Sequence, residues 1–296
     1  MAGTGSSRPE VEPFFHPDTG TFSYVVHEGD GGAAAIVDPV LDYDAVSART
    51  GAQSAEALVA YADAHRLRVE WILETHAHAD HLSAADHLRT RLGARVAIGR
   101  GIVRVQAHFK ALLGWGDAFV PDGRQFDRLL DDGDTLSVGA LEVRMLATPG
   151  HTGDSLTYVA GDAAFIGDTL FAPDVGTARC DFPGGDAAQL YRSIRRILAL
   201  PADTRIFLCH DYPPSQRGPA PLCSIAAQRE GNIHVGQGIA ESAFVAMRNA
   251  RDAKLAPPRL ILPAMQVNIC GGRLPAPAAN GIAYLTLPLN QLGSKP

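Results

Sequence analysis

Long apolar runs are missing from this sequence of 296 residues. No stretch approaches the roughly 20 apolar residues that a membrane helix requires. The first eight residues are small and polar, with no apolar segment after them, which argues against a signal peptide. Runs of lysine and arginine are also missing and the net charge is −6, so neither nucleic acid nor membrane is expected as a partner. The sequence therefore predicts a cytoplasmic protein.

Cysteine is scarce, and the few cysteines lack CxxC spacing. They are Cys180, Cys209, Cys223 and Cys270. We expect reduced thiols rather than a disulfide framework, each more typical of a small buried residue than of a nucleophile. Hydrophobic residues make up 46% of the chain and charged residues 20%. That composition is sufficient for one large domain with a substantial core, or for one domain with an appendage.

The most informative stretch is 75–81, which follows the short apolar run 69–73. Its potential ligands are His76, His78, Asp80 and His81. The run predicts a strand that leads into a loop. Side chains that alternate along extended backbone share one side, and the last histidine reaches the same place from the turn beyond. Four such groups would repel one another or lack partners if buried, and a divalent metal removes both problems. A polar surface loop is the alternative.

Apolar patterns predict strands and helices in both halves of the chain. Strands are expected at 21–26, 34–37, 69–73, 96–98, 135–138, 141–146, 155–160, 163–166 and 206–208. Helices are expected at 54–67, 82–92, 101–112 and 186–199. Ser54 is expected to cap the first helix and Gly93 to end the second. Because strands and helices do not alternate strictly, we expect two mixed sheets packed together with helices outside. Residues 1–13 are predicted to be a disordered lead-in.

Three further candidate residues lie just beyond predicted strands. His151 stands in Thr148–Thr152, Asp168 follows the strand that ends at 166, and His210 follows the strand that ends at 208. Loops at strand ends are where a rigid scaffold usually carries chemistry. Taken alone, each residue is more typical of a structural role. Their shared position, together with the stretch at 75–81, indicates one composite site.

The motifs Thr-His-x-His-x-Asp-His, Thr-Pro-Gly-His-Thr and Gly-Asp, followed by a late histidine, resemble the ligand order of the metallo-β-lactamase superfamily. The resemblance covers about residues 14–212 and implies an α/β fold, an αββα sandwich. For dinuclear members it implies one metal at His76, His78 and His151, a second at Asp80, His81 and His210, and a bridging Asp168. All seven are present, so this ligand set allows a two-metal hydrolase.

Within the superfamily the sequence is most similar to the persulfide dioxygenases, the ethylmalonic-encephalopathy protein family. The similarity lies in 78–81, Arg179–Gly185 and Leu208–Tyr212. Segments 228–235, 245–248 and 263–269 resemble the longer bacterial enzymes that accompany sulfide-responsive regulators. The family usually has threonine at the position of Cys180 and glycine at that of Ala178, so the substrate loop departs from the pattern in detail.

This resemblance implies one Fe(II) per chain and the oxidation of glutathione persulfide by O₂ to sulfite and glutathione. The implied iron ligands are His76, His151 and Asp168, a facial triad, with His78, Asp80, His81 and His210 around them. Arg179 would hold a glutathione carboxylate, and a structural pair with Asp181 is the alternative. Tyr212 would contact the peptide part of glutathione or simply pack.

Two other functions are compatible with the same residues. A dinuclear, zinc-type hydrolase resembling hydroxyacylglutathione hydrolase would act on a glutathione thioester. That family usually carries a bulky residue at the position of Ala79, which is small here. A persulfide sensor without catalytic activity is the third interpretation.

The chain after 212 is predicted to be a C-terminal extension, 213–296, packed on a catalytic domain of residues 14–212. A proline-rich linker begins it. Residues 237–254 predict an amphipathic helix with Ile239, Phe244 (or Ala243), Met247 and Ala250 inward. The extension would either cover the substrate site or form the contact of a homodimer, and the sequence does not choose between them.

Overall fold

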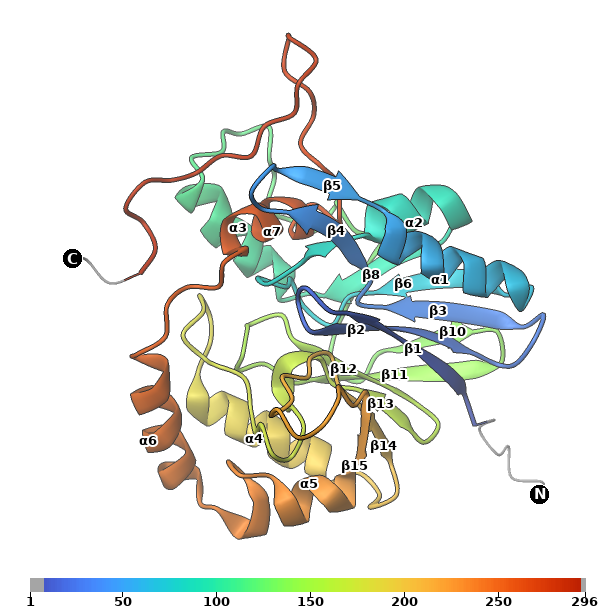
Figure 1. The fold of residues 1–296 in the computed structure, drawn as a ribbon, viewed down its shortest axis with the longest axis vertical. Coiled ribbons are helices and arrows are strands. Elements are labelled where there is room, and N and C mark those ends of the chain that lie inside the picture. Colours follow the sequence, from blue (N-terminus) through green and yellow to red (C-terminus); the bar gives the residue numbers. More distant parts are fainter. Residues whose placement is uncertain (1–7, 294–296) are drawn as a thin grey trace.

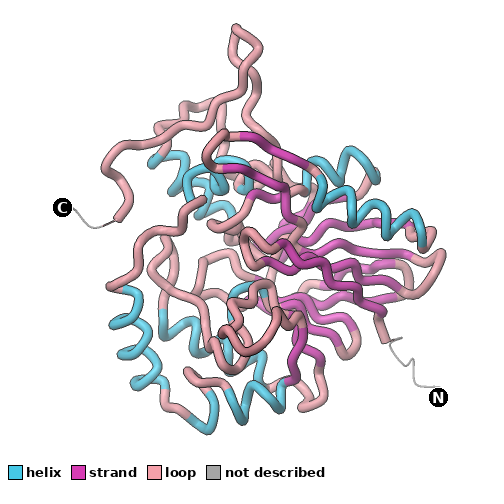
Figure 2. Tube along the Cα trace, viewed as in Figure 1, coloured by secondary structure: helices cyan, strands magenta, loops and turns pink. Residues whose placement is uncertain are grey.

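The computed structural model describes residues 8–293. Two six-stranded sheets lie face to face at its centre, and helices cover the outer face of each (Figure 1). In Figure 2 the strands lie between two groups of helices. This is the αββα sandwich of two mixed sheets that the sequence predicts.

The first sheet is antiparallel at one end and parallel at the other. Its strands, in spatial order, are β1 (Glu10–His16), β2 (Thr21–His27), β3 (Ala33–Val37), β6 (Arg68–Leu73), β8 (Arg95–Gly99) and β9 (Arg128–Leu130). β1 to β3 pair antiparallel, and β3, β6, β8 and β9 pair parallel. A small third sheet joins β5 (Arg49–Gly51), β4 (Val40–Asp44) and β7 (Leu82–Ser83).

The second sheet is antiparallel except for one pair. Its strands, in spatial order, are β10 (Thr135–Val138), β11 (Leu141–Ala147), β12 (Leu156–Ala160), β13 (Ala163–Phe165), β14 (Arg205–Phe207) and β15 (Leu222–Ser224). β13 and β14 pair parallel. The chain crosses between them through α4 (Ala187–Leu198), which packs on the outer face of this sheet.

Helices divide between the two outer faces. The first sheet is covered by α1 (Gln53–Ala64), α2 (Ala85–Leu92), α3 (Ile102–Leu112) and α7 (Ile261–Asn268). The second is covered by α4, α5 (Ile225–Gly231) and α6 (Glu241–Asp252). Two short 3₁₀ helices, η1 (Gly167–Thr169) and η2 (Gly236–Gly238), complete the elements. No helix in residues 8–293 is both long and apolar enough to cross a membrane.

The space between the sheets is filled by aromatic and branched side chains, including Tyr24, Trp71, Tyr158 and Phe165. Tyr158 also crosses the sandwich, because its hydroxyl donates to the carbonyl of Glu74 at 2.7 Å. Burial of this apolar surface is the main term that holds the sheets together. The tyrosine bond adds a direct link from the second sheet to the end of β6, where the predicted site begins.

Three local predictions were tested by the fold. Gly93 ends α2 in the left-handed conformation, at φ 69°, as predicted. Ser54 does not cap α1: its amide and hydroxyl donate to Asp42 instead, at 2.9 and 2.7 Å. The disordered lead-in is wrong for residues 10–13, because β1 begins at Glu10 and pairs with β2 along its whole length. Residues 1–7 lie outside the described part of the chain.

The C-terminal extension packs against both outer faces of the sandwich. α6 lies on the side of α4, with Phe244 fully buried, and α7 lies with the helices of the first sheet (Figure 1). The predicted inward side of α6 is partly wrong. Ala250 is exposed, and the buried positions besides Phe244 are Arg248 and Asp252. A charged pair with its own partners therefore replaces the expected apolar stripe.

Candidate metal centre

All seven predicted ligands lie together at one edge of the sandwich, because the segments that carry them follow neighbouring strand ends. The histidine loop, which we define as residues 75–83, follows β6. His151 follows β11, Asp168 lies in η1 directly after β13, and His210 follows β14. Residues up to 134 positions apart in the sequence, His76 and His210, are thus brought into one buried cluster.

The seven side chains form two adjoining groups. His76, His151 and Asp168 place one donor atom each within 4.8 Å of one another. Oδ2 of Asp168 lies 3.8 Å from Nε2 of His76 and 3.6 Å from Nε2 of His151. These separations are too long for hydrogen bonds and suit donors arranged around a shared ion.

The second group contains His78, Asp80, His81 and His210, again within 4.8 Å. Nε2 of His210 lies 3.1 Å from Oδ2 of Asp80 and 3.3 Å from Oδ1 of Asp168. Asp168 therefore faces both groups with its two oxygens. That position matches the bridging role which the superfamily resemblance implies for it.

Buried donor atoms without partners mark the place where a metal fits. In residues 8–293 the atoms with no hydrogen bond include Nε2 of His76, both ring nitrogens of His78, Nε2 of His81, Nε2 of His210, Oδ2 of Asp80 and Oδ1 of Asp168. Unpartnered buried polar atoms are costly and rare in native proteins. All of these atoms belong to residues of the two groups, and this, together with the chemistry of imidazole and carboxylate, fits a bound divalent metal.

Burial sets the protonation of the histidines of this site in the direction that metal binding requires, and that of Asp168 in the opposite direction. It lowers the pKa of His76 and of His78 well below the usual range, and that of His151 to about 4. Burial also raises the pKa of Asp168 to about 7. Neutral imidazoles keep the lone pair that a metal needs. The fold thus holds these histidines ready as ligands at neutral pH.

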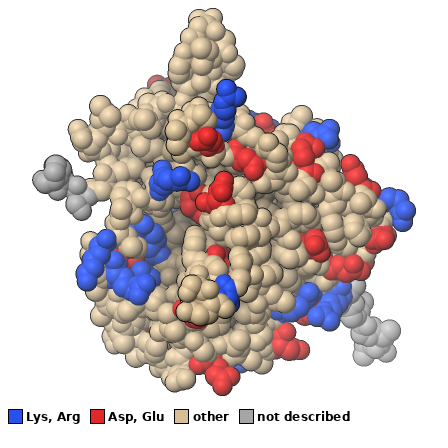
Figure 3. Space-filling model, viewed as in Figure 1, with Lys and Arg blue, Asp and Glu red and all other residues tan. Residues whose placement is uncertain are grey.

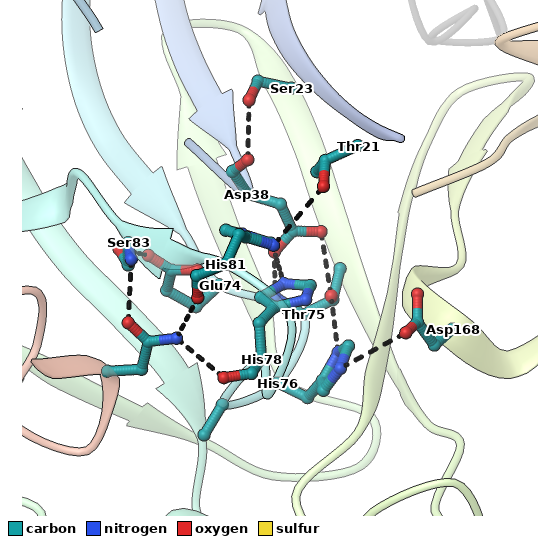
Figure 4. Close-up of polar contacts among 12 residues, drawn as sticks. Thr21, Ser23, Asp38, Glu74, Thr75, His76, His78, His81, Ser83 and Asp168 are labelled. Carbon is teal, nitrogen blue, oxygen red and sulfur yellow. Dashed lines mark hydrogen bonds and ion pairs between the residues drawn. The ribbon is translucent and has the colours of Figure 1, made fainter. Parts of the chain in front are cut away.

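A second set of buried groups orients the ligands. Asp38 accepts hydrogen bonds from the backbone amide and the hydroxyl of Thr75, at 2.7 and 2.8 Å. Thr21 Oγ1 lies 3.2 Å from Nδ1 of His210. It also lies 3.5 Å from Nδ1 of His81, and Figure 4 shows this pair. Such outer contacts fix which ring nitrogen faces the metal.

His151 is oriented by the backbone at Arg179 and by a glycine. Its Nδ1 donates to the carbonyl of Arg179 at 2.7 Å, which leaves Nε2 to face Asp168. The preceding Gly150 has φ 139°, and a Cβ there would lie 2.2 Å from the backbone nitrogen of Leu190. Only glycine lets the loop approach α4 this closely.

A cavity of about 400 Å³ opens over the two groups of potential metal ligands, which we call the metal groups. Its lining residues include Ala79, Asp80, His151, Asp168, Phe171, Phe182, Tyr212, Arg179, Arg248 and Arg251. Aromatic and basic side chains thus line the cavity together with the carboxylates of Asp80 and Asp168. Figure 3 shows basic side chains gathered over α6, the helix that carries two of these arginines.

Both predicted substrate residues, Arg179 and Tyr212, line this cavity. Their side chains, however, already contact other residues of the protein. Arg179 makes a bidentate pair with Asp181, at 2.6 Å for both bonds, and donates to the carbonyl of Ala256. Tyr212 stacks on His210, with ring centroids 5.8 Å apart and planes 9° apart. The fold therefore contains the structural alternative for each residue: an ion pair with Asp181 for Arg179, and packing for Tyr212.

Several residues of the site were not found from the sequence. They are Asp38, Asp154, Arg248, Arg251 and Asn268. The signal for Asp38 was its place at the end of a strand, the criterion that found the other ligands. The remaining four carry no local motif, because their role depends on contacts across the fold.

The four cysteines are free thiols, as expected. Burial raises the pKa of Cys180 to about 12 and that of Cys223 and Cys270 to about 11. Thiolates react, whereas protonated thiols are nearly inert. Cys180 and Cys209 are buried as predicted, whereas Cys223 and Cys270 are only partly buried.

Comparison with known proteins assigns the family. The model of the Metallo-beta-lactamase superfamily matches residues 16–210, and the chain belongs to this superfamily. It is 53% identical over 292 residues to a probable metallo-hydrolase of Burkholderia pseudomallei, covering 95% of this chain and 99% of that protein. A β-lactamase hydrolase-like protein of Agrobacterium fabrum is longer: it is 51% identical over 96% of this chain, which spans 65% of its length.

Relatives of two different activities are found at lower identity. Glyoxylase B2 of Dictyostelium discoideum is 43% identical, over 97% of this chain and 99% of its own. Human mitochondrial persulfide dioxygenase ETHE1 is 32% identical, over 70% of this chain and 71% of its own. The crystal structure of ETHE1 from Myxococcus xanthus superposes with a TM-score of 0.70 at 28% identity, covering 89% of this chain and 100% of that one.

Proposed function

We propose that the chain is a persulfide dioxygenase acting in sulfide detoxification. Glutathione persulfide, O₂ and water would give glutathione and sulfite. The observation that carries this proposal is the grouping of the ligands, in which His76, His151 and Asp168 form a set apart from His78. Two histidines and one carboxylate are the ligand set of non-haem Fe(II) oxygenases. When bound there, Fe(II) would supply the redox chemistry between the sulfur anion and O₂.

The chain's own groups would bind and orient the substrate. Arg251 lines the cavity, and its guanidinium has no ion pair or hydrogen bond within residues 8–293. It is suited to hold a glutathione carboxylate. Ala79 lines the cavity beside the ligands with a single methyl group, which leaves room for the persulfide sulfur. Phe171 and Phe182 would exclude bulk water from the reacting end.

A second candidate is a dinuclear hydrolase of a glutathione thioester. The specific observation in its favour is the second group of ligands, with Asp168 Oδ1 only 3.3 Å from His210 Nε2. The names of two relatives, a probable metallo-hydrolase and a glyoxylase, agree with it. The two ligand groups, with Asp168 facing both, would hold two metals, which would supply the activation of water for thioester hydrolysis.

Metal content and two parallel assays separate these functions. Protein purified without oxygen should contain one iron per chain, consume O₂ with glutathione persulfide and release sulfite. It should leave S-D-lactoylglutathione intact. Two metals per chain, thioester hydrolysis and no O₂ uptake would overturn the proposal and establish the hydrolase.

Paired variants sharpen the same test. His151→Ala should abolish activity in either case, because His151 belongs to the triad. His210→Ala should keep one iron per chain and a measurable rate in a dioxygenase, because His210 would only orient its neighbours. In a dinuclear hydrolase the same change removes a metal ligand, so loss of the second metal together with all activity would favour that alternative.

A further inference from the structure

A side chain near the end of the chain holds the backbone of the histidine loop. Asn268, the last residue of α7, donates from Nδ2 to the carbonyls of His78 and His81, both at 2.8 Å. Its Oδ1 accepts from the backbone amide of Ser83 at 2.7 Å. Figure 4 shows these three loop positions and their bonds. We propose that Asn268 is a positioning residue, and that through these bonds the C-terminal extension sets the geometry of the metal centre.

The histidine loop needs such a partner because all of it before β7 lies outside regular structure. Between the end of β6 at Leu73 and the start of β7 at Leu82, its backbone has neither strand nor helix. His78 and His81 are almost completely buried, so water does not satisfy their carbonyls, and buried carbonyls require partners. An asparagine side chain offers two donor hydrogens and an acceptor in one plane. It matches two carbonyls and one amide.

The bonds fix more than single atoms. Because one nitrogen holds the carbonyls of both His78 and His81, these carbonyls are fixed relative to one another. The two residues between them, Ala79 and Asp80, line the cavity over the metal groups. A shift of either carbonyl would turn the adjoining side chains away from the other donors of the two ligand groups. Small displacements of ligands are sufficient to weaken a metal site.

Asn268 is itself held by packing that does not involve the metal groups. α7 buries Ile261, Ala264, Met265 and Val267 in the core beside the first sheet. After the helix, Gly272 has φ 81°, and a Cβ there would lie 2.8 Å from the backbone nitrogen of Asp86. The backbone of the extension therefore packs directly against the backbone at the start of α2. This packing makes Asn268 a rigid reference point for the loop.

Two carboxylates from the sandwich anchor the first half of the loop in the same way. Asp38 accepts from the amide of Thr75, and Asp154 accepts from the amide of Ala77 at 2.9 Å. Asn268 anchors the second half, which carries His78 and His81. The extension is thus part of the support of the metal centre, whichever reaction that centre performs.

Metal affinity in the full-length chain tests this inference. Gln266 is a matched control: it lies on the same helix, is equally buried, and makes three hydrogen bonds, to Leu262 and twice to Thr286, none of them to the histidine loop. Asn268→Ala, Asn268→Asp and Gln266→Ala would each be prepared metal-free. Affinity for Co(II) would be measured by chelator competition, the visible spectrum of the Co(II) form recorded, and thermal unfolding followed.

We expect Asn268→Ala to bind Co(II) roughly 10- to 100-fold more weakly, the range seen for outer-shell partners of metal ligands, with altered Co(II) absorption bands. Asn268→Asp, nearly the same size, should lose affinity similarly, because it keeps the acceptor for Ser83 but loses both donors. Gln266→Ala should lower the melting temperature and leave affinity and spectrum unchanged. Affinity and spectra of both Asn268 variants equal to wild type would overturn the proposal, while leaving the proposed oxidation untouched.

Discussion

Asp38 Oδ1 lies 3.0 Å from Nε2 of His78, and both residues are buried at the end of the first sheet. The two atoms lack the alignment of a hydrogen bond, but a carboxylate this close favours an imidazole whose other nitrogen faces the metal groups. Asp38 stands at φ 47°, an uncommon conformation for a residue other than glycine. Its two bonds to Thr75 hold it there.

Asp38→Asn should therefore weaken the metal site without unfolding the protein. Asparagine keeps an acceptor for the Thr75 amide but removes the charge beside His78. We expect a loss of metal affinity of about 10- to 100-fold, as for other outer-shell carboxylates, measured by chelator competition. Asp44→Asn, which changes an exposed residue at the end of β4, is the control and should bind metal normally. Equal affinity in the two variants would show that Asp38 serves only the backbone.

The candidate ligands could be picked out from the sequence because six of the seven stand within motifs of a few residues. The strands that position them were predictable from apolar alternation, and β2, β3, β6, β8 and β10–β14 lie where it predicts. β1 was not predicted, because its residues include Glu10, Glu12 and Pro13, which together are typical of an irregular terminus. Pairing along the whole of β2 outweighs that local preference.

Asn268 could not have been predicted, although the segment around it stood out. It lies 185 residues from Ser83, whose amide it binds, and no local pattern encodes such a contact. The predicted apolar inward face of α6 is partly wrong for a similar reason. Arg248 and Asp252 are one helical turn apart and typical of a solvated pair, yet both are buried because the loop before α4 supplies their other partners.

Breaking the buried ion pair of Arg248 and Asp252 should strongly lower the free energy of unfolding. Arg248 donates to Asp252 and to the carbonyl of Thr177, and Asp252 also accepts from the amide of Cys180 at 2.8 Å. Arg248→Met would leave a buried carboxylate without its cation, which typically costs about 3–5 kcal/mol of unfolding free energy. Urea unfolding measures this loss. Adding Asp252→Asn should restore part of it, and a double variant no more stable than the single one would contradict this account.

His234 should make the protein less stable in acid. It is buried beside Gly176, and its Nδ1 accepts from the amide of Thr177 at 3.0 Å, so the folded state holds the neutral ring. Burial lowers the pKa of His234 from 6.5 to about 4. Between these values the unfolded chain binds more protons than the folded one, and stability therefore falls as the pH is lowered from 6.5 to 4.

Urea unfolding of wild type and His234→Gln at pH 7, 6, 5 and 4 tests this sign. The wild-type free energy of unfolding should fall relative to that of the variant by roughly 1–3 kcal/mol across the interval. Comparing the two proteins cancels the titration of groups that they share, such as Asp168. Parallel curves would mean that His234 titrates normally in the folded state.

Arg251 offers the most direct test of the proposed substrate. It faces the cavity from α6, while the guanidinium of Arg179 is already occupied by Asp181. A bond from a guanidinium to a carboxylate is worth roughly 1.5–3 kcal/mol, or about 10- to 150-fold in binding. Because this carboxylate lies far from the reacting sulfur, the bond stabilises bound substrate and transition state equally. Arg251→Ala should therefore raise KM for glutathione persulfide by about that factor and leave kcat near the wild-type value.

Two controls make the Arg251 experiment specific. Lys254→Ala removes an exposed cation just beyond the same helix and should change neither constant. Arg251→Lys keeps the charge but not the planar fork, so it should recover part of the KM effect. For a small persulfide without carboxylates, Arg251→Ala and wild type should have equal kcat/KM. A fall in kcat without a rise in KM would instead place Arg251 in the support of the site, and the glutathione carboxylate would then need another partner.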